Sequence, residues 1–304
     1  MILFSIIIPN YNHAPFLRQR IESVLNQSYQ NFEVILLDDR STDNSWEILK
    51  SFKSHEKVSH CLLNEKNSGN TFKQWQKGIE LAKGDFIWLA ESDDFCDLSF
   101  LSFVVEALQS TNADVVFCKS MFVDEHNTEK GLQALDLASG IHAGDLFVKK
   151  HMYFDNLLIN ASAVVFRKSL ISHDWDPLKV KFRLSGDWYF WVSILKGKTL
   201  FYIDKPLNYY RKHSVSISAS STRLGLWLVE GLKVQAFIEQ NFAIDKEDKS
   251  ALSDVLYKRF FKQLKYLDSD QRNLVFRKVI PKLSFYDRLK ALILFSCLQF
   301  RYKK

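Results

Sequence analysis

The chain has 304 residues, 47% of them hydrophobic and 25% charged, a composition that excludes a disordered or collagen-like protein. The net charge of +6 is uneven: Val255–Lys304 holds thirteen Lys and Arg against three Asp and Glu, a balance of +10 that leaves −4 for the first 254 residues. This asymmetry favours a local anionic partner, such as a membrane surface, over nucleic acid.

The cysteines and the N-terminus indicate the cellular setting. The four Cys lie far apart, and no Cys-x-x-Cys or Cys/His cluster appears, so we expect no structural zinc and a reduced, cytoplasmic environment. The opening MILFSIIIPN has no charged segment before its apolar run and is expected to be a buried strand rather than a signal peptide. No stretch reaches the ~18 uncharged apolar residues of a membrane-spanning helix.

Strand and helix patterns alternate over the first 118 residues. The predicted strands are short apolar runs: Phe4–Ile8, Val34–Leu37, Val58–Leu63, Phe86–Leu89 and Ala113–Cys118. The predicted helices carry apolar stripes between them: Ala14–Gln27, Trp46–Phe52, Phe72–Ala82 and Leu98–Leu108. This alternation predicts an α/β fold with a mostly parallel, doubly wound sheet flanked by helices.

The remainder of the chain is predicted to be irregular at first and then helical. A helix is expected at Ala143–Lys150, a strand at Ala161–Phe166, a helix at Trp188–Leu195 and a strand at Leu200–Ile203. Helical periodicity then runs through Leu224–Asn241, Lys249–Tyr266 and Tyr286–Phe300. We expect two domains, a sheet domain over residues 1–218 and a helical extension over 219–304.

Acidic residues collect after two of the predicted strands. Asp38 and Asp39 follow the second strand, and Glu91-Ser92-Asp93-Asp94 follows the fourth. The carboxyl ends of parallel strands share one edge of the sheet, where open α/β sheets bind ligands. Crowded carboxylates repel one another unless a cation lies among them, and a divalent metal held together with substrate phosphates would satisfy them.

A structural alternative is that these acids cap the following helices. Asp39 and Asp43 would then cap one helix, and Asp94 and Asp97 the next. The glycine-rich fingerprints of other nucleotide-binding folds are absent from the sequence, including G-x-G-x-x-G and a complete P-loop. Any bound phosphates must therefore be held by a metal and by basic side chains.

Three segments together resemble a known family. SIIIPNYNHAPFL, SVLNQSYQNFEVILLDDRSTDNS and NEKNSGNTFKQWQKGIELAKGDFIWLAESDDF are similar to the family 2 glycosyltransferases of the GT-A fold. The similarity resumes in NASAVVFRKSL, LSGDWYFWVSIL and YYRKHSVSIS and so covers residues 1–218 approximately. The resemblance implies an inverting, metal-dependent transfer of a sugar from a nucleotide, expected to be UDP, to a glycan or lipid-linked glycan acceptor in cell-surface polysaccharide synthesis, such as capsule or O-antigen.

The resemblance implies roles for the residues that meet the nucleotide. Pro9 and Tyr11 would line the nucleobase pocket, and Asp39 would accept a hydrogen bond from the base. Glu91, in place of the first acid of the family's Asp-x-Asp motif, would contact the ribose. Lys73 would lie near the ribose or the phosphates.

The resemblance also implies a metal ligand and a general base. Asp93, the last acid of the motif, would bind Mn²⁺ or Mg²⁺, and Arg211 and His213 would close over the diphosphate and the metal. Asp187 matches the family's late acidic residue, the general base, although an N-cap is the alternative. A metal and a basic side chain would stabilise the leaving diphosphate. One base without a second carboxylate nucleophile predicts inversion.

Other residues carry weaker expectations. Asn160, Ser162 and Trp188 are candidates for contacts with the acceptor, with strand-edge or core packing roles as the alternatives. Arg40 stands where the family usually has Gly, which is harmless if the turn avoids positive φ. Trp75 belongs to a stretch that lacks the family's usual Arg, with Lys73 as its substitute.

The C-terminal segment Phe285–Lys304 combines apolar residues with flanking Lys and Arg. It fits an amphipathic helix on the anionic inner face of the cytoplasmic membrane, and a terminal helix docked on the protein is the alternative. For the activity, the alternatives are a sugar nucleotidyltransferase and an inactive relative that binds a nucleotide sugar. The sugar, acceptor, linkage and oligomeric state are left open by the sequence.

Overall fold

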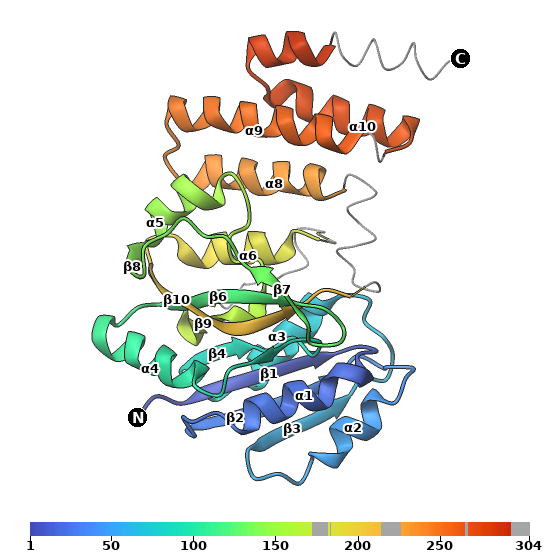
Figure 1. The fold of residues 1–304 in the computed structure, drawn as a ribbon, viewed down its shortest axis with the longest axis vertical. Helices are drawn as coiled ribbons and strands as arrows, with labels where there is room; N and C mark the ends of the chain where they lie inside the picture. The colour runs from blue at the N-terminus through green and yellow to red at the C-terminus, as the bar shows by residue number, and fades with distance from the viewer. Residues whose placement is uncertain (172–181, 183, 214–225, 265–266, 293–304) are drawn as a thin grey trace. The chain divides into compact units, whose positions relative to one another are not determined.

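The computed structural model describes residues 1–171, 182, 184–213, 226–264 and 267–292 (Figure 1). The chain divides into two compact units. One comprises Met1–Gly144 and Leu158–His213, and the other comprises Asp145–Leu157 and the chain from Ser214 onward. The second unit thus takes a segment from the middle of the chain as well as the C-terminal helices. The two-domain boundary predicted at residue 218 stays a prediction, since residues 214–225 lie outside the described residues.

Among the described residues, one mixed sheet of ten strands forms the centre of the first unit. Eight strands lie side by side in the order β3 (Val58–Leu63), β2 (Phe32–Asp38), β1 (Phe4–Asn10), β4 (Phe86–Leu89), β9 (Val164–Arg167), β6 (Val115–Val123), β10 (Thr199–Arg211), β5 (Phe95–Cys96). β7 (Glu129–Leu132) pairs with β6, and β8 (Gly140–Ala143) pairs with β10.

The two halves of the sheet differ in strand direction. β3, β2, β1 and β4 are all parallel, as the alternating pattern of the N-terminal half predicts. β9 is antiparallel to both β4 and β6, whereas β6 and β10 are again parallel to each other. The predicted parallel character therefore holds for β3, β2, β1 and β4. The antiparallel strands β7, β8 and β9 come from the part of the chain where no regular alternation exists, and the short β5 of the N-terminal half is also antiparallel to its neighbour β10.

Helices cover both faces of the parallel half of the sheet. Every residue of β1 is therefore buried. Ile6 and Ile8 belong to one core with Leu17 and Ile21 of α1 (Ala14–Leu25). α2 (Ser45–Ser51) and α4 (Phe100–Thr111) contribute to that same core. Ile7 points the other way, toward α3 (Thr71–Leu81), where a Cβ on Gly78 would come within 2.4 Å of its side chain. Continuous apolar strands are the expected sequence for a sheet buried on both faces.

Aromatic residues of α3 and α6 (Gly186–Leu195) pack together on the second face of the sheet. The ring of Trp75 lies 5.7 Å from that of Phe190 and 6.2 Å from that of Trp191. Phe166 of β9 contacts the same two α6 rings. This packing anchors both helices over the strands whose carboxyl ends carry the acidic residues.

The predicted elements occur with shifted ends in several places. Ala161–Ala163 forms a 3₁₀ turn, so the strand predicted at Ala161–Phe166 is shorter and begins at Val164. β10 continues to Arg211, well beyond the predicted end at Ile203, because register shifts around Pro206 let it remain paired with β6. The predicted helix at Ala143–Lys150 is a short α5 (Gly144–Phe147) followed by a π-helical turn, Val148–Met152.

In the second unit, the described helices are α8 (Leu226–Asn241), α9 (Lys246–Leu264), α10 (Ser269–Val279) and a helical stretch at 285–292. The segment 145–157 joins them through polar contacts. Lys150 Nζ donates to Asp248 Oδ2 at 2.8 Å, and Tyr153 Oη donates to Glu239 Oε1 at 2.7 Å. The rest of the helix predicted at Tyr286–Phe300 lies outside the described residues.

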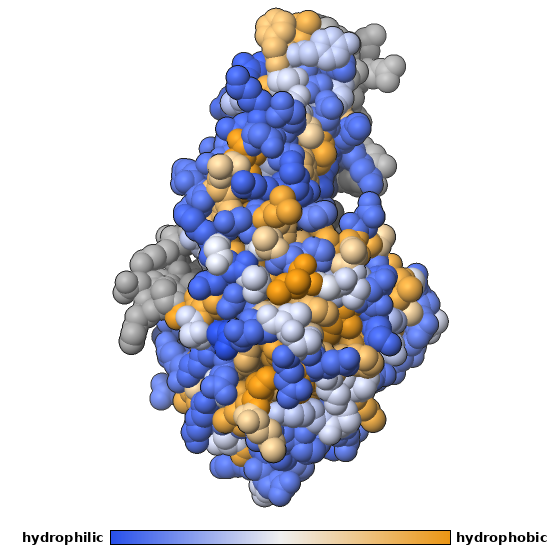
Figure 2. Space-filling model, turned by 90° about the vertical axis from the view of Figure 1, so that its left-hand side faces the viewer, coloured by the Kyte–Doolittle hydropathy of each residue, from blue (hydrophilic) through white to orange (hydrophobic). Residues whose placement is uncertain are grey.

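The surface mixes polar and apolar side chains. On the face drawn in Figure 2, hydrophobic residues form separate patches between hydrophilic ones. In the part of the chain that the structure describes, no helix combines the length and the apolar character needed to span a membrane.

Candidate active site

The turn after β2 holds two buried acids with different surroundings. Asp38 accepts hydrogen bonds from Asn10 Nδ2 at 2.8 Å and from the backbone N–H and the hydroxyl of Ser41, both at 2.7 Å. These bonds tie the end of β1 to the turn. Asp38 is therefore a structural residue of the loop, and Asp39 is the acid that points away from it toward α3.

Asp39 lies at the centre of a donor cluster. Its Oδ1 accepts from Asn64 Nδ2 at 2.7 Å, the Ser68 N–H at 2.9 Å and Gln74 Nε2 at 2.9 Å. Its Oδ2 accepts one hydrogen bond, from the Ser68 hydroxyl at 2.7 Å. A carboxylate oxygen has two acceptor positions, so Oδ2 retains capacity for a further donor such as a base N–H.

The first turns of α3 connect Asp39 with the acids of the neighbouring strand. Gln74 donates to Asp39, and the next residue, Trp75, donates from its indole N–H to Glu91 Oε1 at 2.8 Å. Asp39 and Glu91, which are 52 positions apart in the sequence, are thus held by two adjacent residues of α3. Neither contact was predicted, since the sequence of this stretch is distinguished only by the absence of the Arg that is usual in the family it resembles.

Buried side chains hold the Glu91–Asp94 turn after β4 in place. Arg20 is fully buried and donates from Nε to the Glu91 carbonyl at 2.9 Å. Ser162 accepts from the Glu91 N–H at 3.0 Å and donates to Asp94 Oδ2 at 2.6 Å. Asp94 also accepts from Asn160 Nδ2 at 2.8 Å. Asp94 is therefore the anchor of the turn, and burial together with the adjacent Asp93 charge raises its pKa.

Burial has a large effect on Glu91. Loss of solvation, with the nearby Asp93 charge, raises the pKa of Glu91 to about 8, despite the hydrogen bond from Trp75. A carboxyl group whose pKa is raised in this way holds its proton to a higher pH than an exposed one, and in the protonated form it can donate a hydrogen bond as well as accept one.

Asp93 is the acid of this turn that meets histidines. His213, just after β10, places Nε2 at 3.1 Å from Asp93 Oδ2. Burial alone would raise the pKa of Asp93, but the hydrogen bond from His213 and the charges of His13 and His213 lower it below its ordinary value. The same hydrogen bond raises the pKa of His213.

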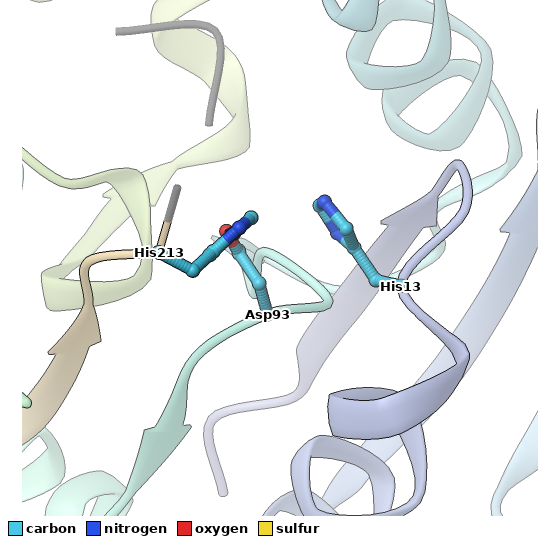
Figure 3. A group of neighbouring side chains, drawn as sticks. All are labelled: His13, Asp93 and His213. Carbon is cyan, nitrogen blue, oxygen red and sulfur yellow. The ribbon is translucent and has the colours of Figure 1, made fainter. Parts of the chain in front are cut away.

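His13, Asp93 and His213 together form a group with metal-ligand chemistry (Figure 3). One potential ligand atom from each residue lies within 4.8 Å of those from the other two. They come from the ends of three strands, β1, β4 and β10, so the sheet itself brings them together. His13 was not among the predicted residues. Its position directly after the first strand, at the edge that carries the acids, was the signal available in the sequence.

Arg211 supports the acidic turn from inside the protein. It is 1% exposed, and its Nε donates to the Asp93 carbonyl at 2.7 Å. Its two terminal nitrogens donate to the Asp124 carbonyl at 2.8 Å and to Gln19 Oε1 at 3.0 Å. These contacts make Arg211 a positioning residue for Asp93. The predicted contact of Arg211 with a diphosphate stays a prediction. The guanidinium group is buried in this structure.

Two of the acceptor candidates face the interior instead of a cleft. Asn160 and Ser162 are buried, and both side chains bind Asp94. Trp188 is buried as well, on α6. The observed contacts agree with the structural alternatives, strand-edge and core packing, and contact with an acceptor stays untested.

Asp187 lies in the first turn of α6. Its Oδ1 accepts from the Trp188 N–H at 2.7 Å, while Ser185 occupies the N-cap position. The preceding Gly186 packs on α3, where a Cβ would lie 2.4 Å from the Phe72 ring. Since Phe72 and Trp75 are in ring contact and Trp75 binds Glu91, the helix start that carries Asp187 rests on the same part of α3 as the acids.

The other predicted nucleotide contacts lie around the same edge. Pro9 is buried at the end of β1, and Tyr11, just after it, is 44% exposed. Lys73 is exposed on α3, with Nζ donating to the Ser68 carbonyl at 3.3 Å. Ser68 in turn binds Asp39. An exposed aromatic ring and an exposed cation are therefore available beside the buried acids.

Of the four acids named in the helix-capping alternative, Asp43 and Asp97 accept hydrogen bonds from N–H groups near helix starts. Asp43 accepts from the Ala14 N–H at the start of α1 and the Ser45 N–H at the start of α2. Asp97 accepts from the Ser99 N–H ahead of α4. Asp39, Glu91 and Asp93 make other contacts, so capping does not explain the acids of the candidate site.

Comparison with known proteins decides the family. The sequence model of glycosyl transferase family 2 matches residues 5–174, more than half of the chain. The chain belongs to glycosyl transferase family 2. This family 2 enzyme is 36% identical to the glycosyltransferase GlyG of Streptococcus pneumoniae serotype 4 over 123 residues, which are 40% of each chain. It is 24% identical to the GalNAc(5)-diNAcBac-PP-undecaprenol beta-1,3-glucosyltransferase of Campylobacter jejuni, over 80% of this chain and 76% of that one.

A solved structure confirms the fold. TarS of Staphylococcus aureus (residues 1–349, in complex with UDP-GlcNAc) superimposes with a TM-score of 0.71 at 19% identity, over 93% of this chain and 82% of that one. The α/β fold of the family 2 glycosyltransferase, with its sheet, flanking helices and helical C-terminal region, is thereby confirmed as that of the GT-A enzymes.

Proposed function

We propose that this family 2 glycosyltransferase moves a sugar from a UDP-linked donor to a hydroxyl of a growing cell-surface glycan. The observation that carries the proposal is the convergence of Asp39, Glu91 and Asp93 on one sheet edge, joined through Gln74 and Trp75 of α3. The bound UDP-GlcNAc of TarS supports UDP as the nucleotide. The glucosyltransferase of Campylobacter, whose substrate is attached to undecaprenyl diphosphate, supports a lipid-linked glycan as the acceptor.

In the proposed arrangement, each part of the donor meets its own residues. Tyr11 packs on the nucleobase beside Pro9, and Asp39 Oδ2 accepts from the base. Glu91 binds the ribose, whose hydroxyl groups can donate to its carboxyl oxygens. Lys73 lies near the phosphates. The residues proposed to meet the base and the ribose follow β2, β1 and β4, which lie side by side in the sheet in that order.

A divalent metal fits the residues beyond Glu91. Asp93 and His213 would hold it, since a carboxylate and an imidazole whose ligand atoms lie 3.1 Å apart suit adjacent positions on one ion. When bound, Mn²⁺ or Mg²⁺ would neutralise charge on the diphosphate. Arg211 and Arg20 keep the Asp93 turn in place through its carbonyl oxygens.

The transfer itself requires one base. Asp187 takes the proton of the acceptor hydroxyl as its oxygen forms a bond to the anomeric carbon and the bond to the UDP oxygen breaks. The electron pair of that bond leaves with UDP, and the proton stays on Asp187. A single displacement of this kind inverts the anomeric centre, and general base catalysis contributes about 10²–10⁴-fold to the rate.

We place the enzyme at the inner face of the cytoplasmic membrane, where a lipid-linked acceptor would be found. The exposed apolar residues Phe285, Tyr286, Leu289 and Leu292 recur along the helical stretch 285–292. Arg288 and Lys290 flank them. This combination of apolar and basic residues suits the surface of an anionic bilayer.

A thermal-shift panel of nucleotide sugars, with and without Mn²⁺, tests the donor assignment. A ligand that binds only the native protein raises Tm, so UDP and one UDP-sugar should raise it more than the GDP or CDP counterparts, and more with Mn²⁺ than with EDTA. Product NMR with that donor should show an inverted anomeric configuration. Equal shifts for all nucleotides would reject UDP, and a retained configuration would reject the single displacement.

A further inference from the structure

His13 stands at a helix start without acting as its cap. It occupies the N-cap position of α1, but the α1 N–H of Ala14 is satisfied by Asp43 Oδ2 at 2.9 Å and the His13 side chain makes no capping hydrogen bond. The imidazole turns instead toward the acidic turn after β4. Its Nδ1 lies 2.8 Å from the Ser92 hydroxyl, between Glu91 and Asp93.

The contact with Ser92 is compatible with either ring tautomer, since a hydroxyl can donate or accept. In the tautomer whose Nδ1–H donates to Ser92 Oγ, Nε2 carries the lone pair that a metal needs. Histidines that bind metals usually have their other ring nitrogen fixed in this way by an oxygen acceptor. Ser92 is itself 1% exposed, so it holds the ring rigidly.

The three-residue geometry is close to that of a metal centre. The 3.1 Å between His213 Nε2 and Asp93 Oδ2 is the spacing of adjacent ligands on one ion with bonds of about 2.1 Å. The ligand atoms of all three residues lie within 4.8 Å of one another, whereas two ligands on one such ion are at most about 4.2 Å apart. A shift of the side chains toward one another would therefore complete the set, and Figure 3 shows the His213 ring beside Asp93 with the His13 ring facing them.

We propose that His13 is a third protein ligand of the catalytic metal, beside Asp93 and His213. The proposal rests on the proposed function, since it concerns the metal that would bind the donor diphosphate. Two imidazoles and one carboxylate leave positions open for diphosphate oxygens. This ligand set favours Mn²⁺ and the later divalent transition metals over Mg²⁺, which prefers oxygen ligands.

The test compares Mn²⁺ binding to the full chain in three variants, by the loss of the free-ion EPR signal. His13→Asn keeps a polar group at the position of Nδ1 for Ser92 and removes Nε2. We expect its Kd for Mn²⁺ to rise by at least the about 10–100-fold that loss of an outer-shell partner costs. Ser92→Ala should cause a smaller rise, because the ring loses its orientation and not its ligand atom. His126→Asn, at an exposed histidine in the turn after β6, is the matched control and should bind as the parent does.

Pulsed EPR of bound Mn²⁺ then counts the coupled imidazole nitrogens without any need for activity. The parent should show two, and His13→Asn and His213→Asn should each show one. Two in the parent and one in His213→Asn support the proposal even if His13→Asn does not fold. An unchanged Kd and nitrogen count in His13→Asn would overturn the proposal while leaving Asp93 and His213 as ligands. If the parent binds no Mn²⁺ even with UDP present, the metal dependence of the proposed function fails as well.

Discussion

Gln74 Nε2 donates to Asp39 Oδ1 at 2.9 Å, and both side chains are buried. This bond joins the third helix to the turn after the second strand. The neighbouring bond from Trp75 to Glu91 joins the same helix to the turn after the fourth strand. α3 therefore sets the distance between the residue proposed to bind the base and the residue proposed to bind the ribose.

Gln74→Glu should disrupt this connection in a pH-dependent way. It places a second acid against Asp39, and two buried carboxyl groups cannot both ionise cheaply. At pH 8 we expect a loss of about 1–3 kcal/mol in the free energy of unfolding and weaker UDP binding. At about pH 5 a protonated Glu can again donate, so much of the loss should disappear.

Urea denaturation and calorimetric titration with UDP at both pH values measure these effects. Gln76→Glu, on the same helix, is the matched control and should change little. A Gln74→Glu loss that is equal at the two pH values would contradict the carboxyl–carboxyl explanation.

Glu91→Gln should stabilise the metal-free protein at neutral and alkaline pH. The carboxyl has a pKa of about 8 in the folded protein, against about 4.3 in an unfolded chain. Between these values the unfolded chain releases the proton and the folded one keeps it, so stability falls as pH rises. Gln keeps an acceptor for Trp75 and cannot ionise, so the pH dependence of stability that comes from Glu91 is removed.

Thermal unfolding in EDTA at about pH 5 and pH 8 tests that sign. The Tm advantage of Glu91→Gln should be larger at the higher pH by several degrees or more, since one unit of pKa difference is about 1.4 kcal/mol and about 1 kcal/mol corresponds to about 2–4 °C for a domain of this size. An advantage that does not change with pH would show that the pKa of Glu91 is not raised by burial.

Asp187→Asn should separate catalysis from donor binding. Asn can still accept the hydrogen bond from the Trp188 N–H but cannot take a proton. We expect turnover to fall about 10²–10⁴-fold while the Kd for UDP stays within a factor of about two to three. Steady-state rates and calorimetry measure the two quantities. Glu22→Gln, at an exposed acid on α1, is the control, and near-full activity of Asp187→Asn would remove Asp187 as the base.

Arg40→Gly should stabilise the protein. Arg40 has a φ of 63°, so the turn does use the left-handed region, contrary to the harmless case considered from the sequence. A non-glycine residue there costs about 1–2 kcal/mol, partly offset by the entropy that Gly loses on folding, so we expect a net gain of up to about 1 kcal/mol.

Arg40→Ala is the informative control for this effect. It removes the long side chain and keeps the Cβ, so its free energy of unfolding in urea should stay close to that of the parent. If Ala stabilises as much as Gly, the cause is the Arg side chain and not the backbone conformation.

Substitution of the exposed face of 285–292 should weaken binding to anionic vesicles. Phe285 is 82% exposed, and a double change Phe285→Glu and Leu289→Glu puts negative charge on the face proposed to meet lipid. Cosedimentation with vesicles that contain phosphatidylglycerol should fall several-fold and should be low with phosphatidylcholine alone, since the attraction is partly electrostatic. Leu132→Glu, on exposed β7, is the control. Equal sedimentation of the two variants would reject the lipid surface.

The sequence by itself determined the alternating elements of the N-terminal half and the location of the acids. Strands such as Phe4–Asn10 are so continuously apolar that only burial on both faces suits them, and the residues after such strands must gather at one edge. The motifs also identified the family, which the match over residues 5–174 confirmed.

Only the tertiary structure decided which polar residues face the site and which support it. Asp38 and Asp39 are adjacent and chemically identical, yet one ties β1 to its turn and the other faces α3. Arg211 is buried below Asp93, and His13 turns from a helix start toward Ser92. Such roles depend on contacts between segments tens to more than a hundred residues apart, and a local pattern of residue types carries no information about the direction in which a side chain points.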